Sequence, residues 1–316
     1  MHVSVVIPVY NEEETLPLLR KAIYDALKDV TFTWQTILVN DGSKDNSWQI
    51  MKEFALEDPE HFQSILLRRN FGQTAAIAAG IDHANGDVIV LMDADLQNDP
   101  VDIPMLIEKI EEGYDVVSGW RYHRQDNIIR RLPSKIANGL ISWVTGVHLH
   151  DYGCTLKAYR REVITGFRLY GEMHRFIPVY ANTIGAKILE VRVNHHARKF
   201  GKANYGLERT FKVVLDLFTV KFLNQYSNKP IYLFGGTGIV LMLVSLAALL
   251  FLGVRRVFFD VSVLGSPIFQ MATMIFILGF QSILMGLIAE LLVRTYHESQ
   301  NKRTYTIREI ANGDES

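Results

Sequence analysis

The sequence predicts an α/β domain with a mainly parallel sheet, followed by two helices long enough to cross a membrane. In residues 1 to about 160, short runs rich in β-branched and apolar residues alternate with stretches of helical pattern. This alternation is typical of a sheet built from right-handed βαβ units. From residue 230 onward, two long stretches carry almost no charge, and such stretches are typical of membrane-spanning helices.

The predicted elements follow one another in a regular order. The expected strands are "VSVVIPV", "TILVN", "QSILLR", "DVIVLMD" and "DVVSGW", and helices are expected at 12–29, 44–57, 72–84 and 100–112. Ligands of such sheets bind beyond the carboxyl ends of the strands. Polar residues follow nearly every strand there, so we expect one continuous polar rim. For any single strand end, an ordinary turn or helix cap is the alternative.

The composition excludes several classes of function. The chain has 316 residues, 33 of them basic and 34 acidic, and this balance gives no reason to propose a nucleic-acid partner. Cys154 is the only cysteine, so an internal disulfide and a cysteine-based metal cluster are both excluded. The start, "MHVSVVIPVY", lacks the basic residues and cleavage site of a secretory signal and instead alternates like a strand.

The uncharged stretches predict a membrane hairpin. Ile231–Val254 contains no charged residue, and a second uncharged run covers Val261–Ala289, interrupted by Pro267. Each is long enough for a bilayer core of roughly 30 Å. Two buried helices of a soluble protein are the alternative, which the length and lack of charge disfavour. The loop between them would carry Arg255, Arg256 and Asp260.

The charges that flank the hairpin predict its orientation. The flanking basic residues are Lys212, Lys221 and Lys229 on one side and Arg294, Lys302, Arg303 and Arg308 on the other. Basic flanks stay in the cytoplasm, so we expect a multi-pass inner-membrane protein. We assign 1–205 to a cytoplasmic catalytic domain, 206–229 to an amphipathic interfacial helix, 230–293 to the hairpin and 294–316 to a cytoplasmic tail. A core-packed helix is the alternative for 206–229.

Three aspartates follow the fourth strand, and they have different expected roles. Asp99 precedes Pro100 and a helical pattern, which is typical of an N-cap. Asp93 and Asp95 are two residues apart at the strand end, where both carboxylates can face one small volume and would repel each other. A hard cation, Mg²⁺ or Mn²⁺, would relieve that repulsion, and Gln97 would add another oxygen ligand.

Four stretches in this order resemble the inverting glycosyltransferase family 2, of GT-A fold, over about residues 1–205. They are "VVIPVYNEEETL", "ILVNDGSKDNS", "NFGQTAAIAAGIDHANGDVIVLMDADLQNDP" and "DYGCTLKAYRREV". With the amphipathic segment and hairpin added, the chain resembles polyprenyl-phosphate glycosyltransferases. These include dolichol-phosphate mannose synthases, and the closer likeness is to bacterial enzymes that load glucose or a related sugar onto undecaprenyl phosphate.

The resemblance implies roles for the matching positions. Residues implied to bind the nucleotide are Pro8, Tyr10, Glu12, Asp41 and Asp93. Residues implied to bind the metal and diphosphate are Asp93, Asp95 and Gln97, and the implied catalytic residues are Asp95 and Asp151. Asp151 occupies the position of the acid that handles the acceptor. A phosphate monoester is already mostly dianionic at neutral pH, so we expect Asp151 to position groups more than to abstract a proton.

Basic residues are candidates for binding the acceptor phosphate. They are Arg121, Arg130, Arg131, Arg198 and Lys202. The family often ends this domain with a Ser-Lys-Tyr triplet, but Ala203 and Asn204 replace its serine and lysine here. A solvated face is the alternative for the charge run at 121–131. His148, His150, His195 and His196 lack metal-ligand spacing and are interpreted as ordinary polar residues.

The predicted function is inverting transfer of a hexose, with glucose favoured, from a nucleotide diphosphate sugar, with UDP favoured, to a polyprenyl phosphate. A processive polysaccharide synthase is one alternative, but its Gln-x-x-Arg-Trp motif and additional spans are missing from the sequence. A non-catalytic nucleotide-sugar-binding membrane anchor is another, which the aspartates disfavour. Glycine and serine faces such as "GGTGIV" also allow a homo-oligomer.

Overall fold

The computed structural model describes residues 1–122, 139, 142, 145–165, 169, 173–197, 231–259, 265–299 and 305–311. These belong to two compact units, one formed by residues 1–218 and 303–316 and the other by residues 219–302. The strands are β1 (His2–Val9), β2 (Thr33–Asn40), β3 (Phe62–Leu67), β4 (Val88–Leu91), β5 (Val116–Trp120), β6 (Lys157–Arg160), β7 (Ile188–Arg192) and β8 (Ile307–Ala311). The helices are α1 (Leu16–Leu27), α2 (Ser47–Glu57), α3 (Gln73–His83), η1 (Pro100–Asp102), α4 (Ile103–Glu111), α6 (Arg161–Ile164), η2 (Met173–Phe176), α7 (Ile177–Thr183), α9 (Ile231–Phe259) and α10 (Pro267–Ser299).

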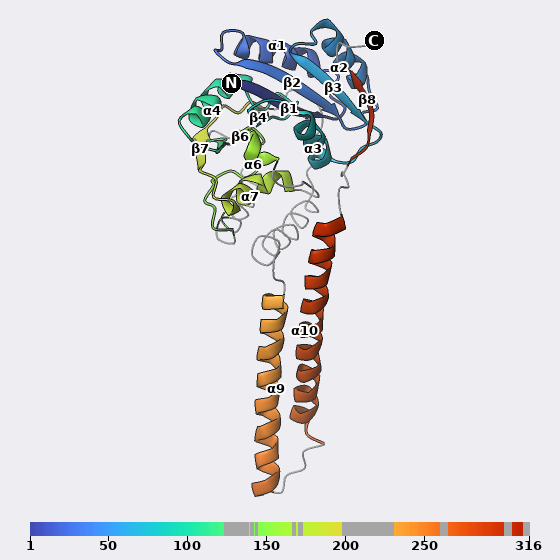
Figure 1. Ribbon diagram of the computed structural model, residues 1–316, viewed down its shortest axis with the longest axis vertical. Coiled ribbons are helices and arrows are strands. Elements are labelled where there is room, and N and C mark those ends of the chain that lie inside the picture. The colour runs from blue at the N-terminus through green and yellow to red at the C-terminus, as the bar shows by residue number, and fades with distance from the viewer. Residues whose placement is uncertain are drawn as a thin grey trace. The chain divides into compact units, whose positions relative to one another are not determined.

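The first unit is built on one mixed sheet with the strand order β7-β5-β6-β4-β1-β2-β3-β8 (Figure 1). Strands β1 to β4 pair in parallel with one another, as do β5 and β7. The antiparallel pairs involve β6, which lies between β4 and β5, and β8 at the edge. The five strands predicted from the sequence are all present, and β6, β7 and β8 are additions to them.

The register of the sheet brings several strand ends together. Val9 of β1 pairs with Asn40 of β2, and Val6 of β1 pairs with Leu91 of β4. Because these strands are parallel, the residues that follow them emerge at the same edge of the sheet. The expected polar rim therefore forms around the ends of β1, β2 and β4.

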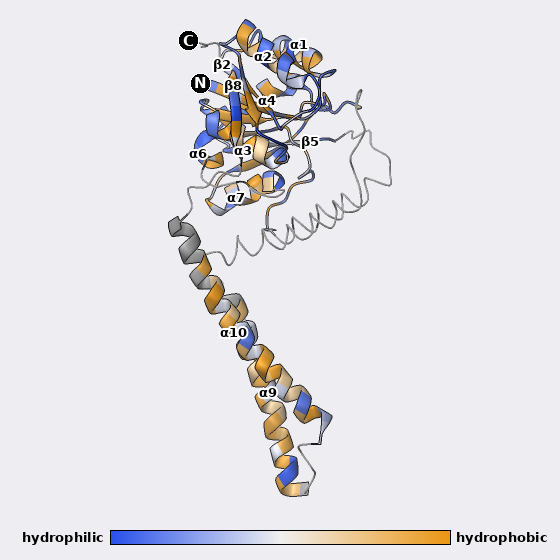
Figure 2. Ribbon diagram, turned by 90° about the vertical axis from the view of Figure 1, so that its right-hand side faces the viewer, coloured by the Kyte–Doolittle hydropathy of each residue, from blue (hydrophilic) through white to orange (hydrophobic). Residues whose placement is uncertain are grey.

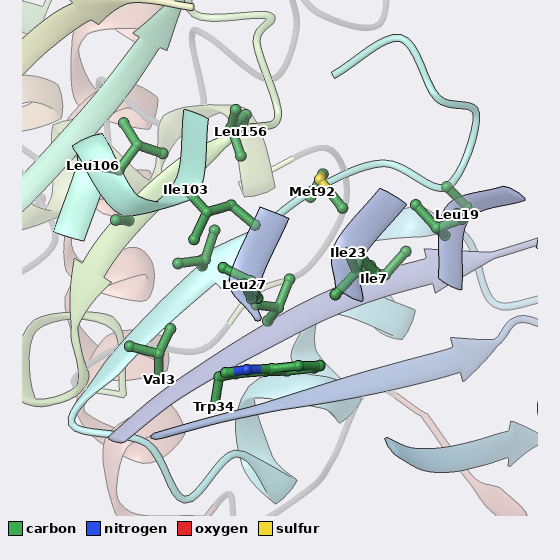
Figure 3. Packing of buried hydrophobic residues seen from close by; sticks show 14 of the residues in the cluster. Val3, Ile7, Leu19, Ile23, Leu27, Trp34, Met92, Ile103, Leu106 and Leu156 are labelled. Atoms are coloured by element: carbon green, nitrogen blue, oxygen red, sulfur yellow. The ribbon is translucent and has the colours of Figure 1, made fainter. Parts of the chain in front are cut away.

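The hydrophobic core fills the space between one face of the sheet and helices α1 and α4 (Figure 3). Alternate residues of β1, such as Val3 and Ile7, face this core because side chains alternate along a strand. Leu19, Ile23 and Leu27 of α1 meet them at helical spacing. Full burial of each such side chain stabilises the fold by about 1.5–3 kcal/mol.

Strand β8 follows the two long helices in sequence and belongs to the same sheet as β1 to β7. It pairs antiparallel with β3, with Ile310 opposite Ile65. Around it, the Tyr305 hydroxyl donates to Asp82 Oδ2 at 2.7 Å, and Lys52 Nζ lies 3.1 Å from Glu309 Oε1. The segment interpreted from the sequence as a tail thus contributes an edge strand to the sheet.

The second unit is a pair of helices, α9 and α10, whose composition is apolar over most of their length (Figure 2). Their segments Phe234–Phe258 and Pro267–Ala289 are long and apolar enough to cross a membrane, by length and composition. Two details differ from the sequence prediction. Arg255 and Arg256 belong to α9 rather than to the loop, and Pro267 begins α10, where a proline is tolerated because its missing N–H needs no partner.

Small residues allow α9 and α10 to approach closely. A Cβ atom on Gly238 would lie 2.5 Å from the Gly279 carbonyl oxygen, and one on Gly279 would lie 2.7 Å from the Gly238 carbonyl oxygen. Nearby, the Ser245 hydroxyl donates to the Ala272 carbonyl at 2.6 Å. Within this chain, Gly238 of the "GGTGIV" stretch therefore packs one helix against the other, as small residues do in membrane helix pairs.

We expect Gly238→Leu to destabilise the helix pair, because its side chain would overlap the backbone of α10. The cost should be about 1–3 kcal/mol, typical of overpacking, measured as a lower unfolding temperature in detergent. Gly236→Leu is the matched control, since a Cβ atom at Gly236 meets nothing within 4 Å. Equal unfolding temperatures for the two variants would contradict this account of the helix contact.

Candidate active site

A cavity of about 700 Å³ opens at the carboxyl ends of β1, β2 and β4. The predicted site residues that line it are Pro8, Tyr10, Glu12, Asp41, Asp93, Asp95, Gln97 and Arg121. The structure therefore brings the predicted nucleotide and metal residues to one place. The predictions for Arg130, Arg131, Arg198, Lys202 and the interfacial helix at 206–229 lie outside the described residues.

Core packing explains why Asp93 and Asp95 reach the cavity. Met92 and Ala94 are buried in the hydrophobic core cluster, and the carboxylates that alternate with them line the cavity. Leu96 then adopts a left-handed backbone conformation, with φ of 59°, which is costly for a leucine. This sharp bend follows Asp95 directly, and Gln97 beyond it lines the same cavity.

Asp93 is held from two sides. Its Oδ1 accepts a hydrogen bond from Gln73 Nε2 at 2.8 Å, and its Oδ2 accepts one from the Thr155 hydroxyl at 2.7 Å. Burial, and next the charge of Asp95, raise the pKa of Asp93 to about 6. Gln73 and Thr155 were not predicted; their only signal in the sequence was a polar side chain close to a strand end.

The donor set of this aspartate pair fits a hard divalent cation. Asp93, Asp95 and Gln97 offer carboxylate and amide oxygens, which Mg²⁺ and Mn²⁺ prefer. The two hydrogen bonds to Asp93 leave further lone pairs on its oxygens. A cation would also remove the repulsion that raises the pKa of Asp93.

Asp41, which follows β2, is hydrogen-bonded to the loop between β3 and α3 beside the cavity. Its Oδ1 accepts from the Phe71 backbone N–H at 2.7 Å, and its Oδ2 accepts from the Gly72 N–H at 2.9 Å. Gly42, next to it, has a φ of 69°, and a Cβ there would lie 2.6 Å from the Arg69 carbonyl carbon. Asp41 lines the cavity as expected, and it also fixes the loop between β3 and α3.

Arg121, which lines the cavity, forms a bidentate ion pair with Asp151. Arg121 Nε donates to Asp151 Oδ2 at 2.7 Å, and Arg121 Nη2 donates to Asp151 Oδ1 at 2.9 Å. Burial disfavours the charged guanidinium, but the hydrogen bonds and charge of Asp151 outweigh it and raise the pKa of Arg121. Arg121 lines the cavity, whereas Asp151, which is 5% exposed, is not among the lining residues.

Glu190 on β7 fixes the loop that carries Asp151. Its Oε1 accepts from the backbone N–H groups of His150 and Asp151, at 2.8 and 3.0 Å. Its Oε2 lies 2.6 Å from His150 Nδ1, and the His150 ring stacks on Trp120 with centroids 4.2 Å apart. Sequence reasoning missed Glu190, because it lies about forty residues from the loop that it holds.

The remaining sequence interpretations concern Asp99 and the histidines. Asp99 caps η1, as predicted, because its side chain accepts from the Val101 N–H. His196 Nε2 lies 2.8 Å from Asp99 Oδ2, and His150 pairs with Glu190. Within the described parts of the chain, no group of three or more His, Cys, Asp or Glu side chains is arranged to hold a metal ion.

Comparison with known proteins identifies the family. Residues 4–167 match the family described as "Glycosyl transferase family 2". A relative from Rhizobium johnstonii, dodecaprenyl-phosphate galacturonate synthase, is 39% identical over 319 aligned residues, covering 98% of this chain and 93% of the relative. The chain belongs to glycosyl transferase family 2. The family resemblance predicted from the four sequence stretches is thus confirmed.

Two further similarities extend this assignment to glycosyl transferase family 2. The undecaprenyl-phosphate 4-deoxy-4-formamido-L-arabinose transferase of Photorhabdus laumondii is 39% identical over 309 residues, covering 98% of this chain and 94% of the relative. The crystal structure of glucosyl-3-phosphoglycerate synthase from Mycobacterium tuberculosis has a TM-score of 0.54 and 17% identity, over 71% of this chain and 78% of that one. The latter supports the predicted GT-A fold.

Proposed function

We propose that this chain transfers a sugar from a nucleotide diphosphate sugar to a polyprenyl phosphate, with inversion at the anomeric carbon. The observation that carries the proposal is the cavity in which Asp93 and Asp95 lie with Arg121. The two relatives named above, similar over nearly the whole chain, are both named for sugars joined to polyprenyl phosphates. The described apolar helices α9 and α10 suit a lipid acceptor.

In the proposed reaction, a phosphate oxygen of the lipid attacks the anomeric carbon opposite the leaving nucleotide diphosphate. Pro8, Tyr10 and Glu12 at the end of β1 border the nucleotide. Arg121 provides a guanidinium for the acceptor phosphate, since its bonds to Asp151 use only part of its five N–H donors. The phosphate is already ionised, so no general base is needed. Asp151 then acts by orienting Arg121.

A divalent cation, Mg²⁺ or Mn²⁺, is part of the proposal. Asp93, Asp95 and Gln97 would hold it, and it would supply positive charge where the leaving diphosphate develops negative charge. Two observations support it: the oxygen donor set, and the raised pKa of Asp93, to which burial contributes most and the neighbouring charge of Asp95 next. The structurally similar Mycobacterium tuberculosis enzyme was crystallised with Mn²⁺ and UDP.

The donor is proposed to carry UDP, and the experiment below identifies its sugar. The sequence favoured glucose, whereas the relatives' names give galacturonate and 4-deoxy-4-formamido-L-arabinose. The test is to incubate purified protein, Mg²⁺ or Mn²⁺ and a short polyprenyl phosphate with a panel of UDP-sugars. Mass spectrometry then identifies the glycolipid. Absence of any sugar-phosphate lipid across the panel would overturn the proposed function.

The two helices are proposed to form a hairpin in the inner membrane with the catalytic unit in the cytoplasm. Strands β1 to β7 precede the helices and β8 follows them, yet all belong to one sheet. Both flanks of the helix pair must therefore lie on the same side of the membrane. The basic residues of these flanks favour the cytoplasmic side.

Cysteine labelling in whole cells tests this orientation. Cysteines introduced at Asn228 and Asn301 should react only after permeabilisation, whereas one at Ser262, which lies between the two helices in sequence, should react from outside. The natural Cys154 is 1% exposed and serves as the unlabelled background. Reaction of all three introduced cysteines from the same side would refute the hairpin.

A further inference from the structure

We propose that Lys157 and Tyr159, beside Ser118, form an inner subsite that binds a carboxylate on the transferred sugar, so that the donor is a nucleotide-linked uronic acid. This inference rests on the proposed function, and it adds the chemical class of the sugar. None of the three residues was predicted to belong to the site. They lie on neighbouring strands, with Ser118 of β5 directly opposite Lys157 of β6.

Lys157 is a buried ammonium group that forms no ion pair with the described residues, although the charge of Asp151 acts on it. It is 2% exposed and lines the cavity. Its Nζ donates to the Tyr152 carbonyl oxygen at 3.1 Å, and no carboxylate in the described parts of the chain lies within ion-pair distance of it. Burial lowers the pKa of Lys157 to about 8. A buried charge without a partner is strongly destabilising, so this arrangement calls for an anionic ligand.

Two buried hydroxyl groups accompany the ammonium group. The Tyr159 hydroxyl and the Ser118 hydroxyl have no hydrogen-bond partner among the described residues, and both side chains are 0% exposed. Tyr159 lines the cavity, two residues from Lys157 on the same face of β6. Buried polar groups are nearly always hydrogen-bonded in native proteins, so the Tyr159 hydroxyl is a further donor available to a ligand in the cavity. Ser118 is not among the residues that line the cavity, and it accompanies Lys157 on the neighbouring strand.

The position of Lys157 assigns it to the sugar rather than to the diphosphate. The diphosphate belongs with Asp93 and Asp95, whose charges require a cation. Lys157 instead bonds to Tyr152, the residue after Asp151. Its strand lies between the strand that leads to Asp93 and the strand that leads to Arg121. In the proposed reaction, the sugar occupies the space between the diphosphate and Arg121. A substituent of the sugar ring is therefore the part of the donor that meets Lys157.

A carboxylate matches this subsite better than a neutral substituent. It neutralises the ammonium charge, and its two oxygens offer about four acceptor positions, enough for the ammonium and the Tyr159 hydroxyl. A hydroxymethyl or formamide group would leave the ammonium without an ion pair. We therefore expect selection for a uronic acid, with the acid group as the distinguishing feature.

Paired donors test the inference. UDP-glucuronate is compared with UDP-glucose, and UDP-galacturonate with UDP-galactose, because each pair differs only at C6. In at least one pair, the wild type should use the acid with at least a roughly tenfold higher kcat/KM. Lys157→Met should lower kcat/KM for that acid roughly 30-fold, typical of a lost charged hydrogen bond, and for its neutral partner less than about threefold. Lys21→Met, at an exposed position of α1, is the control.

Binding gives a second readout that does not need turnover. With a pKa of about 8, half of Lys157 is neutral at pH 8 in the free protein, so pairing with a carboxylate should take up about half a proton. Calorimetry in two buffers of different ionisation enthalpy measures the protons taken up on binding. The wild type should take up about half a proton more with the acid donor than with its neutral partner, and Lys157→Met should show no such difference. If that variant does not fold, Tyr159→Phe replaces it, with a several-fold loss of kcat/KM confined to the acid.

Three results would overturn the subsite. They are a preference for the neutral donor in both pairs, an equal loss for acid and neutral donors in Lys157→Met, and equal proton uptake for the two donors. A preference for UDP-4-deoxy-4-formamido-arabinose over both acids would do the same. Failure of the proposed function is distinct, because no donor would then yield a glycolipid, while the calorimetric comparison would still decide whether Lys157 binds a carboxylate.

Discussion

Asp95→Asn should lower turnover by roughly a hundredfold or more. The substitution removes one of the two carboxylates that line the cavity beyond β4, and losses of this order are expected when a principal electrostatic stabiliser of a leaving group is lost. Turnover is measured as glycolipid formed per enzyme with saturating donor. Excess chelator added to wild type should produce a comparable loss.

The same variant should be more stable than wild type without metal at neutral pH. Asp95 is one cause of the raised pKa of Asp93, about 6 when folded against an ordinary value of 3.8. A carboxyl whose pKa is raised by folding costs stability above its folded pKa, and this cost vanishes below its unfolded pKa. The unfolding temperature of Asp95→Asn should therefore exceed that of wild type by the largest amount above about pH 6, and the difference should disappear below about pH 4.

Asp99→Asn is the matched control for this loop. It removes the same charge four residues away, and asparagine caps a helix about as well as aspartate. Its turnover should stay within a few-fold of wild type. Near-normal turnover of Asp95→Asn, or of wild type in chelator, would show that the aspartate pair does not hold a catalytic metal.

Asp151→Asn should lower turnover by about a hundredfold at every pH above 7. Asp151 holds Arg121 through two short hydrogen bonds, and misplacement of a positioned group by about 1 Å can cost roughly a hundredfold in rate. Because the acceptor phosphate is already ionised above about pH 7, wild type and variant should have the same pH profile there. Initial rates between pH 6 and 9 measure it.

A second arginine–aspartate pair provides the control. Asp115→Asn weakens the pair between Asp115 Oδ1 and Arg160 Nε, which are 3.3 Å apart, and neither residue lines the cavity. Its effect should be on stability and not on turnover. If Asp151→Asn instead recovers steeply as the pH rises while wild type stays flat, Asp151 abstracts a proton and the positioning role is wrong.

Local pattern was sufficient to predict the first five strands, β1 to β5, and the aspartate pair. The alternation that buries Met92 and Ala94 is visible in the sequence, and it directs Asp93 and Asp95 to the cavity. Because β1 and β2 are parallel and Val9 pairs with Asn40, Tyr10 and Asp41 follow at the same edge of the sheet. These features depend on neighbours in sequence and on a general rule of sheet geometry.

The unpredicted features depend on contacts between distant parts of the chain. Glu190 reaches the Asp151 loop across 39 positions, and Arg121 meets Asp151 across 30. Neither pairing produces a periodic pattern in the sequence around these residues. Lys157 stood in a stretch quoted for its family resemblance, and only the sheet shows that its ammonium is buried.

The position of β8 in the sheet has a consequence for the order of folding. A ribosome makes β3 and its neighbours first, then α9 and α10, and only afterwards residues 307–311. Until then, the edge of β3 that β8 covers has free N–H and C=O groups, which favour pairing with other chains. In the proposed topology, the catalytic sheet is completed only after both helices have entered the bilayer and the chain has returned. Newly made chains that fail to insert should therefore keep an open sheet edge and aggregate, which couples correct insertion to a finished enzyme.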